Sequence, residues 1–178
     1  IKEPVALYID ISETNYHKAN ILGVSLYNEK IHYYIPVDSL EDLSFIQGKV
    51  YTYDAKKNYV LLKKNQMSVL KVYMDVMIAS YLLNYNVKDN IANVAAALGY
   101  ELEFSSKKEQ LSLEEIALRN VKRAKFIYDI TERLYNEMRE KEVLSLYNEI
   151  ELPLSVVLAK MELEGICCDK TILDDMGE

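Results

Sequence analysis

The chain has 178 residues, and half of them are hydrophobic, which is enough for one globular domain and the beginning of a second. Its formal net charge of −7 argues against a surface that binds nucleic acid through many Lys and Arg contacts to phosphate. The two cysteines, Cys167 and Cys168, are adjacent and have no other partner, so we expect a reduced, intracellular setting. The sequence has no apolar run of about 18 residues and no secretory signal, so we expect neither membrane insertion nor secretion.

The first part of the chain predicts three antiparallel strands. Two segments rich in apolar and β-branched residues flank a polar loop, and a third follows the polar pair Asn28-Glu29, which suits a hairpin. The predicted strands cover residues 5–13, 21–27 and 30–35. Pro36 ends the third strand, and Ser39 is then placed to cap a short helix over residues 40–46.

Strands and helices alternate in the middle of the chain, which predicts parallel strands covered by helices. The predicted strands are 49–53 and 68–73, and the predicted helices are 54–64, 76–83 and 91–98. Asp54, Asp75 and Asn90 stand where these helices begin and are suitable N-caps, and Gly99 ends the last one. Together with the first three strands, this pattern predicts an α/β fold with a mixed sheet.

The last third of the chain is predicted to be helical. It follows a polar connection over residues 101–110, and its apolar residues recur at helical spacing. The predicted helices cover residues 113–138, 142–147 and 151–164. Gly165 is the expected C-cap, followed by an extended piece over residues 166–170 and a new helix from Thr171.

Asp10, near the end of the first predicted strand, is the first candidate for a metal ligand. A strand-borne magnesium site normally places a second acid two residues further on, because residues i and i+2 share a face of the strand. That position is Ser12, and the next acid, Glu13, falls on the opposite face unless the strand bulges. The residues alone therefore offer half of a metal site.

Other polar and aromatic residues give weaker signals. Two small basic clusters, within residues 56–64 and 119–125, are typical of solvated helix faces. His17 and His32 have no acid or second histidine at ligand spacing, so neither is assigned a metal or acid–base role. The fifteen tyrosines are interpreted as compositional and not as a stacking platform for nucleic acid.

Three segments carry a family resemblance. They are residues 147–169 with Glu151-Leu-Pro-Leu154, residues Asn15-Tyr-His-Lys-Ala19 with Gly23, and residues Asp75-Val-Met-Ile-Ala-Ser-Tyr-Leu-Leu-Asn84. The chain resembles the 3′-5′ exonuclease-type domain of family A bacterial DNA polymerases (DNA polymerase I), in its degenerate Gram-positive form. The resemblance implies an RNase H-like (DnaQ-like exonuclease) fold over residues 1–150 and the truncated start of a polymerase domain over residues 151–178. From the start of the sequence itself, we also expect Ile1 to be a fragment boundary.

An active domain of this family holds two metal ions with four acids and hydrolyses phosphodiester bonds. In its first motif, Asp-x-Glu, this chain keeps Asp10 but has Ser12 at the position of the glutamate. In its second, Asn-x-x-x-Asp, this chain has Asp54 at the amide position and Asn58 at the acid position. Both departures remove a carboxylate at a metal position.

The third motif, Tyr-x-x-x-Asp, departs furthest. The matching residues are Arg119 and Arg123, so a cation stands where the family has a metal-binding acid. The resemblance thus implies that Asp10, Ser12, Asn58 and Arg123 are vestigial positions with no catalytic, cofactor-binding or metal-binding role. On this interpretation Asp10 is a polar residue at a strand end, and Asp54 is an N-cap.

The leading hypothesis is a catalytically inactive domain that supports the DNA-dependent DNA polymerase domain of the same chain in replication and repair. No cofactor is expected in this chain, whereas Mg²⁺ is expected for the parent polymerase. We expect DNA to be contacted through the parent protein. The expected location is the bacterial cytoplasm, in association with the nucleoid. One alternative is an active metal-dependent 3′-5′ proofreading exonuclease with a rearranged site of Asp10, Glu13 and Asp54. Another is a module that binds single-stranded DNA, which the charge disfavours.

Overall fold

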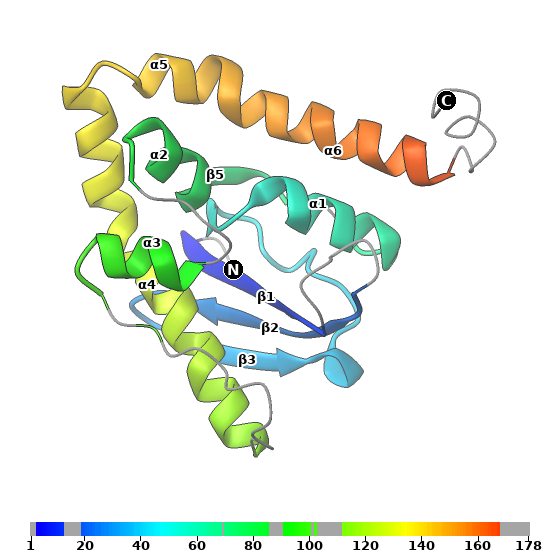
Figure 1. Ribbon diagram of the computed structural model, residues 1–178. Helices are drawn as coiled ribbons and strands as arrows, with labels where there is room; N and C mark the ends of the chain where they lie inside the picture. The colour runs from blue at the N-terminus through cyan, green and yellow to red at the C-terminus, as the bar shows by residue number, and fades with distance from the viewer. Residues whose placement is uncertain are drawn as a thin grey trace.

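The computed structural model describes residues 3–12, 19–68, 70–85, 91–100, 102 and 112–167. Its strands are β1 (Val5–Ile11), β2 (Ile21–Tyr27), β3 (His32–Pro36), β4 (Val50–Thr52) and β5 (Val72–Asp75). They form one sheet in the order β3-β2-β1-β4-β5, in which the first three strands are antiparallel and β4 and β5 run parallel to β1 (Figure 1). The predicted mixed α/β sheet is confirmed.

Helices cover both faces of this sheet. They are η1 (Val37–Ser39), α1 (Ala55–Lys64), α2 (Val76–Leu82), α3 (Ile91–Ala97), α4 (Leu113–Glu140), α5 (Leu144–Leu146), η2 (Tyr147–Glu151) and α6 (Leu152–Cys167). The predicted caps of two helices are confirmed, because Asp54 accepts a hydrogen bond from the Lys57 amide and Asp75 accepts from the Met77 and Ile78 amides. The predicted cap Asn90 and the helix start at Thr171 lie outside the described residues, as does most of the 101–110 connection.

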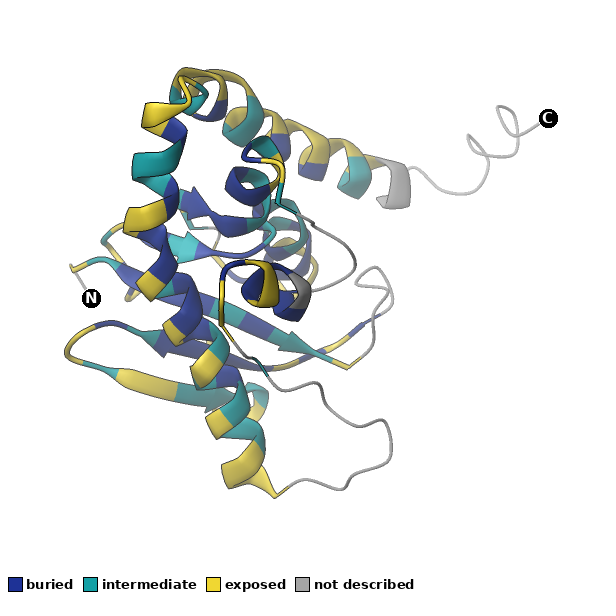
Figure 2. Ribbon diagram, turned by 60° about the vertical axis from the view of Figure 1, so that its left-hand side comes forward, coloured by how far each residue is buried: buried dark blue, intermediate teal, exposed yellow. Residues whose placement is uncertain are grey.

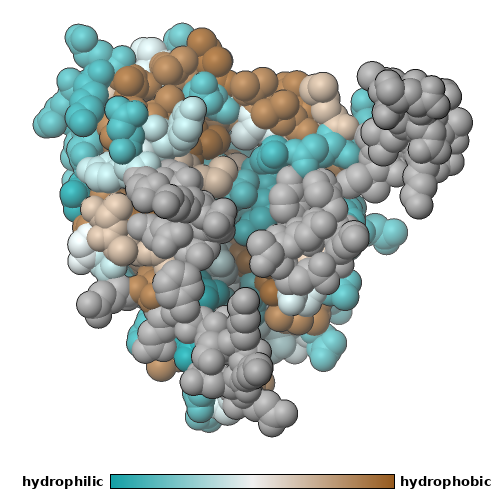
Figure 3. Space-filling view, viewed as in Figure 1, coloured by the Kyte–Doolittle hydropathy of each residue, from teal (hydrophilic) through white to brown (hydrophobic). Residues whose placement is uncertain are grey.

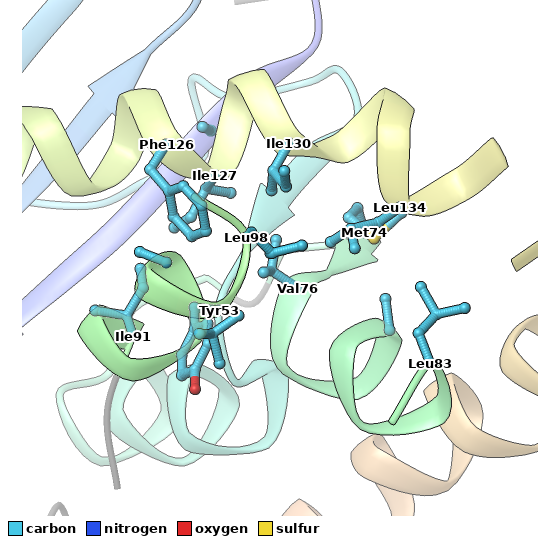
Figure 4. Packing of buried hydrophobic residues seen from close by; sticks show 14 of the residues in the cluster. Tyr53, Met74, Val76, Leu83, Ile91, Leu98, Phe126, Ile127, Ile130 and Leu134 are labelled. Atoms are coloured by element: carbon cyan, nitrogen blue, oxygen red, sulfur yellow. The ribbon is translucent and has the colours of Figure 1, made fainter. Parts of the chain in front are cut away.

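Two hydrophobic cores lie on opposite faces of the sheet, because side chains alternate between its faces. Leu7 and Ile9 of β1 point into the core that α1 covers, whereas Ala6 points toward α4. On the α4 side, Ile127, Ile130 and Leu134 pack against β5, α2 and α3 (Figure 4). Figure 2 shows the result along α4, whose buried residues form a stripe toward the sheet while its other side is exposed.

The predicted helix over residues 40–46 is wrong. Leu40, Leu43 and Ile46 are buried under the sheet at a spacing that resembles a helix, but residues 40–46 form one bend and one turn. The carboxylate of Asp42 accepts bonds from the amide nitrogen (2.7 Å) and hydroxyl (2.8 Å) of Ser68. These long-range bonds tie the segment to the chain before β5, so the segment follows the sheet surface and does not coil.

Two predicted boundaries are also wrong. β5 begins at Val72 and not at Ser68, because Ser68 is bonded to Asp42 outside the sheet. The last helix does not end at Gly165 but continues to Cys167, so the extended piece predicted from residue 166 does not begin there. A glycine lowers helix stability by about 1 kcal/mol without ending the helix.

Residues 144–167 form one uninterrupted helical segment in which η2, a π-helical turn, joins α5 to α6. Pro153, two residues after the end of this turn, has no N–H to donate, and a π turn can absorb the resulting misfit in the helix. Tyr147 of η2 is fully buried, and α6 runs back along α1, where Lys56 and Glu162 form an ion pair of 2.8 Å (Figure 1). Within the described ranges, no helix has both the length and the hydrophobicity of a membrane span.

Candidate functional site

The carboxylate of Asp10 is surrounded by hydrogen-bond donors and a cation. Its Oδ2 atom accepts from Asn120 Nδ2 of α4 at 3.2 Å and from the Tyr34 hydroxyl of β3 at 3.4 Å. Arg123 lies one turn along α4 from Asn120, donates to its Oδ1 atom at 3.2 Å, and stacks its guanidinium 5.3 Å from the ring centroid of Tyr8. Burial raises the pKa of Asp10, while the Arg123 charge and the Asn120 and Tyr34 bonds act in the opposite direction.

Gly23 makes the Tyr34 contact geometrically possible. In the β1–β2 ladder Gly23 lies directly opposite Asp10, and β3 brings Tyr34 across β2 toward the same point. A Cβ atom on Gly23 would overlap the phenol group of Tyr34, so a side chain at this position would displace it. The glycine therefore allows the hydroxyl to reach the carboxylate.

Ser12 is engaged with the backbone of the neighbouring strand. Its hydroxyl accepts from the Asn20 amide at 2.9 Å, and its own amide donates to the Asn20 carbonyl at 3.0 Å. The residue is exposed and holds together the ends of β1 and β2. Ser12, two residues after Asp10 in the sequence, therefore has a local structural role.

Asn58 lies in a different environment from Asp10. Its side-chain amide is buried and donates to Thr52 Oγ1 at 2.5 Å, and that hydroxyl donates to the Leu7 carbonyl at 2.8 Å. Asn58 also lines a cavity of about 200 Å³ together with Pro153 and Val156 of α6. The structure therefore places Asn58 at the contact between the sheet, α1 and α6 and shows no bond from it to Asp10.

Lys57 provides a second cation near Arg123. Burial lowers the pKa of Lys57, and the Arg123 charge lowers it further, while Asp54 acts in the opposite direction.

Three residues near Asp10 were not predicted from the sequence, namely Tyr34, Asn120 and Lys57. Only Asn120 had a usable signal, since Asn120 and Arg123 are three residues apart on a predicted helix and so share a face. Tyr34 reaches Asp10 through strand pairing, which no local pattern in the sequence indicates.

The residues around Asp10 do not fit a magnesium ion. Mg²⁺ is held by oxygen acceptors, usually carboxylates, with near-octahedral geometry. The groups directed at Asp10 are an amide N–H, a phenol O–H and, nearby, a guanidinium, all of which are donors. In the described part of the chain, no three His, Cys, Asp or Glu side chains lie together in a way that could hold a metal ion.

The alternative site of Asp10, Glu13 and Asp54 is only partly visible. Glu13 lies outside the described residues. Asp54 has a left-handed backbone conformation (φ 68°), and its side chain caps α1 by accepting from the Lys57 amide at 3.1 Å. The Asp54 backbone amide in turn donates to Asp75 at 2.9 Å, so the residue is fixed at the junction of β4 and α1.

The fold defines the class of the protein: it is the RNase H-like fold of 3′-5′ exonucleases. Escherichia coli RNase D superposes with a TM-score of 0.72 at 13% identity, covering 89% of this chain and 45% of RNase D. Brucella melitensis NrnC with bound Mg²⁺ superposes with a TM-score of 0.69 at 12% identity, covering 92% of this chain and 87% of NrnC. These identities establish the fold alone.

The family model of the DNA polymerase I ribonuclease H-like domain matches residues 7–108, and the chain belongs to this family. DNA polymerase I of Bacillus subtilis is 29% identical over 98% of this chain, and that of Lactococcus lactis subsp. cremoris is 31% identical over 96%. The chain spans only 22% and 20% of the length of these two relatives. The polymerase fragment of Mycobacterium smegmatis Pol1, in complex with DNA and dNTP, superposes with a TM-score of 0.72 at 17% identity over 91% of this chain and 29% of the fragment.

Proposed function

We propose that this chain is a catalytically inactive exonuclease-like domain that acts as a structural platform for the polymerase domain of a bacterial DNA polymerase I. The observation that carries the proposal is the environment of Asp10, where Asn120 and Tyr34 donate to the carboxylate and Arg123 lies beside it. A divalent metal ion would have to displace these donors and approach a fixed cation. Both requirements weaken metal binding at the position where an exonuclease of this fold needs it.

The helix α6 supports the platform role. Its exposed hydrophobic residues, together with Leu146 of α5 and Ile150 of η2, form an apolar stripe (Figure 3). We define this α6 stripe as Leu146, Ile150, Leu154, Val157, Leu158 and Met161. An exposed apolar surface of this kind commonly marks an interaction site. We assign it to the polymerase domain, which would begin near residue 151, so that one continuous helix belongs to both parts of the protein.

The wider role of the parent protein follows from its relatives. Their name, DNA polymerase I, supports a parent that copies DNA in replication and repair, with Mg²⁺ serving its polymerase centre and not this domain. DNA would then be contacted through the parent protein, because this chain carries a net charge of −7. The corresponding location is the bacterial cytoplasm, in association with the nucleoid.

A nuclease assay tests the inactive assignment. The purified chain is incubated with single-stranded DNA labelled at its 3′ end, in Mg²⁺ or Mn²⁺, beside an active 3′-5′ exonuclease as positive control. We expect no metal-dependent release of mononucleotides. Metal-dependent release by this chain that is lost in the Asp10→Ala variant would overturn the proposal and establish the exonuclease alternative. Release that persists unchanged in Asp10→Ala identifies a contaminating nuclease, because the Asp10 carboxylate is required in either active arrangement.

A further inference from the structure

Five tyrosine rings form a continuous row on the α4 side of the sheet. They are Tyr27 of β2, Tyr51 of β4, Tyr73 of β5, and Tyr128 and Tyr135 of α4. Successive centroids are 5.6 Å apart for Tyr27–Tyr128 and 5.8 Å apart for Tyr128–Tyr51, Tyr51–Tyr73 and Tyr73–Tyr135. The rings are only partly buried, so parts of them face solvent.

A cavity of about 340 Å³ opens against this row, and we call it the tyrosine cavity. Four of the rings line it, together with two glutamates. Its lining includes Tyr51, Tyr73, Tyr128, Tyr135, Glu29 and Glu132. Glu29 lies between β2 and β3 and Glu132 lies on α4, and both are exposed. Among the residues that the structure describes, neither carboxylate has an ion-pair partner and no Lys or Arg lines the cavity.

Three of the rings have a raised pKa, which favours their neutral form, and one of these three already attracts a cation. Burial raises the pKa of Tyr51 and Tyr128, and burial with the Tyr135 contact raises that of Tyr73 to about 12. The ammonium group of Lys49 lies 4.3 Å from the ring centroid of Tyr73, just outside the tyrosine cavity. The π faces of aromatic rings carry negative potential, so they bind ammonium and guanidinium groups.

We propose that the tyrosine cavity binds an organic cation, an alkylammonium or guanidinium group, between the tyrosine rings and the two glutamates. The rings supply cation–π contacts, and Glu29 and Glu132 supply the counter-charge at the rim. Such a group is carried by a free polyamine and by an arginine or lysine side chain of a protein. This inference is independent of the role of α6 and of the state of Asp10.

The same residues argue against the two other ligands that tyrosines and glutamates suggest. Stacked bases of single-stranded nucleic acid need nearby cations for their phosphates, but the cavity offers two carboxylates. A divalent metal ion needs about six oxygen ligands close together, whereas most of this lining consists of aromatic rings.

Titration of the purified chain with small probes, followed by NMR chemical shifts, tests the proposal. The probes are N-acetylarginine amide, its neutral citrulline counterpart, and spermidine. We expect saturable shifts of tyrosine-cavity resonances with both cations at millimolar concentration, and at least about fivefold weaker binding of citrulline. Whichever cation binds more tightly identifies the source, polyamine or protein side chain. Absence of binding by both cations, or citrulline binding as tightly as arginine, would overturn the proposal.

Charge variants show whether the glutamates take part. The double variant Glu29→Gln/Glu132→Gln should weaken binding of both cations by about fivefold, because each exposed ion pair contributes a fraction of a kcal/mol. The matched control is the double variant Glu114→Gln/Glu140→Gln, which removes two exposed carboxylates from the ends of α4, away from the cavity, and it should change binding less than about twofold. If both variants weakened cation binding equally, the weakening would follow from the net charge of the protein alone, and this result would contradict the proposal. Both glutamates are exposed, so these variants should fold.

Ring variants show whether the aromatic face takes part. Tyr51→Phe keeps the ring and should retain binding within about twofold, whereas Tyr51→Leu should weaken it by about fivefold. Unchanged binding in Tyr51→Leu would contradict the proposal. An oligothymidylate that shifts the same resonances more strongly than either cation would also overturn it, in favour of a nucleic-acid platform.

Discussion

The surroundings of Asp10 are the basis of the proposal that this domain is inactive. Its partners are Tyr34 and Asn120, which donate hydrogen bonds, and Arg123, which supplies positive charge. A metal site at this position requires acceptors and negative charge. The identity of the neighbouring side chains, more than the presence of the aspartate, therefore decides what the site can bind.

The structure indicates which substitutions would bring carboxylates to Asp10. In the double variant Asn120→Asp/Arg123→Asp, two new acids on one face of α4 would lie beside Asp10, so their repulsion should destabilise the metal-free protein. Millimolar Mg²⁺ should then raise the melting temperature by several degrees, while the parent shows no shift. Thermal unfolding followed by circular dichroism, with and without EDTA, measures both effects.

The triple variant Ser12→Glu/Asn58→Asp/Arg123→Asp is the matched comparison. It restores the acids that the family motifs name, but Asn58 is bonded to Thr52 and Ser12 to Asn20. We expect a smaller response to Mg²⁺ than in the double variant. A larger response in the triple variant would mean that these side chains turn toward Asp10 when they become acidic, and would contradict the placement described above.

Asp75 should make stability depend on pH. Burial raises its pKa to about 6 from an ordinary 3.8, although the amides of Ala55, Met77 and others donate to it. Because the folded protein binds this proton more tightly than the unfolded chain, the contribution is fully present below about pH 4 and is lost as the pH rises through 6. It amounts to about 3 kcal/mol.

Urea unfolding between pH 4 and pH 8, for the parent and for Asp75→Asn, isolates this contribution. The variant should be less stable throughout by about 2 kcal/mol or more, because an amide N–H would face backbone donors. The stability difference between parent and variant should be largest at low pH and shrink toward pH 8. A difference that grows with pH would show that the carboxylate is ionised in the folded protein at pH 4.

At the scale of elements, the sequence predicted most of the fold because periodicity and caps are local signals. The β1–β2–β3 hairpins, the βα alternation and the long α4 helix all follow from spacing and from Asp54 and Asp75. The prediction of a helix over residues 40–46 was wrong because the shape of this segment depends on a hydrogen bond between Asp42 and Ser68, which are 26 residues apart. The surroundings of Asp10 were missed for the same reason, since Asn120 is 110 residues away.

Tyr147 links the C-terminal helical segment to the sheet. Its buried hydroxyl accepts from the Asp75 amide at 2.8 Å and donates to the Tyr73 carbonyl at 3.0 Å, at the end of β5. Tyr147→Phe should lower the free energy of unfolding by about 1–3 kcal/mol, because the amide and the carbonyl lose a buried partner. Chemical denaturation measures this difference.

The control for Tyr147→Phe is Tyr81→Phe on α2, where the side chain is 68% exposed. That variant should change stability by less than about 0.5 kcal/mol. Equal effects of the two substitutions would mean that the hydroxyl of Tyr147 is not what holds η2 to the sheet.

At the scale of the whole molecule, the α6 stripe should govern self-association. With this stripe exposed, the 178-residue chain should form reversible oligomers that sedimentation velocity detects as a concentration-dependent increase in sedimentation coefficient. Val157→Lys/Met161→Lys should give a monomer at the same concentrations, because two charges would enter the contact.

The matched control is Leu113→Lys/Leu118→Lys, which places the same charges on two exposed leucines of α4. It should associate as the parent does. A parent that remains monomeric at high concentration, or equal loss of association in both variants, would show that the α6 stripe is not a contact surface.

The π turn η2 has a consequence for the angular setting of α6. Each residue in an α-helix advances the side-chain direction by about 100°. A π turn takes about one residue more than an α turn, so closing residues 147–151 into α geometry with no residue lost would rotate every downstream side chain by roughly that angle around the helix axis. Val157 and Met161 would leave the outer surface while the helix kept its position, so the turn sets the direction around the helix axis in which this domain presents its hydrophobic side.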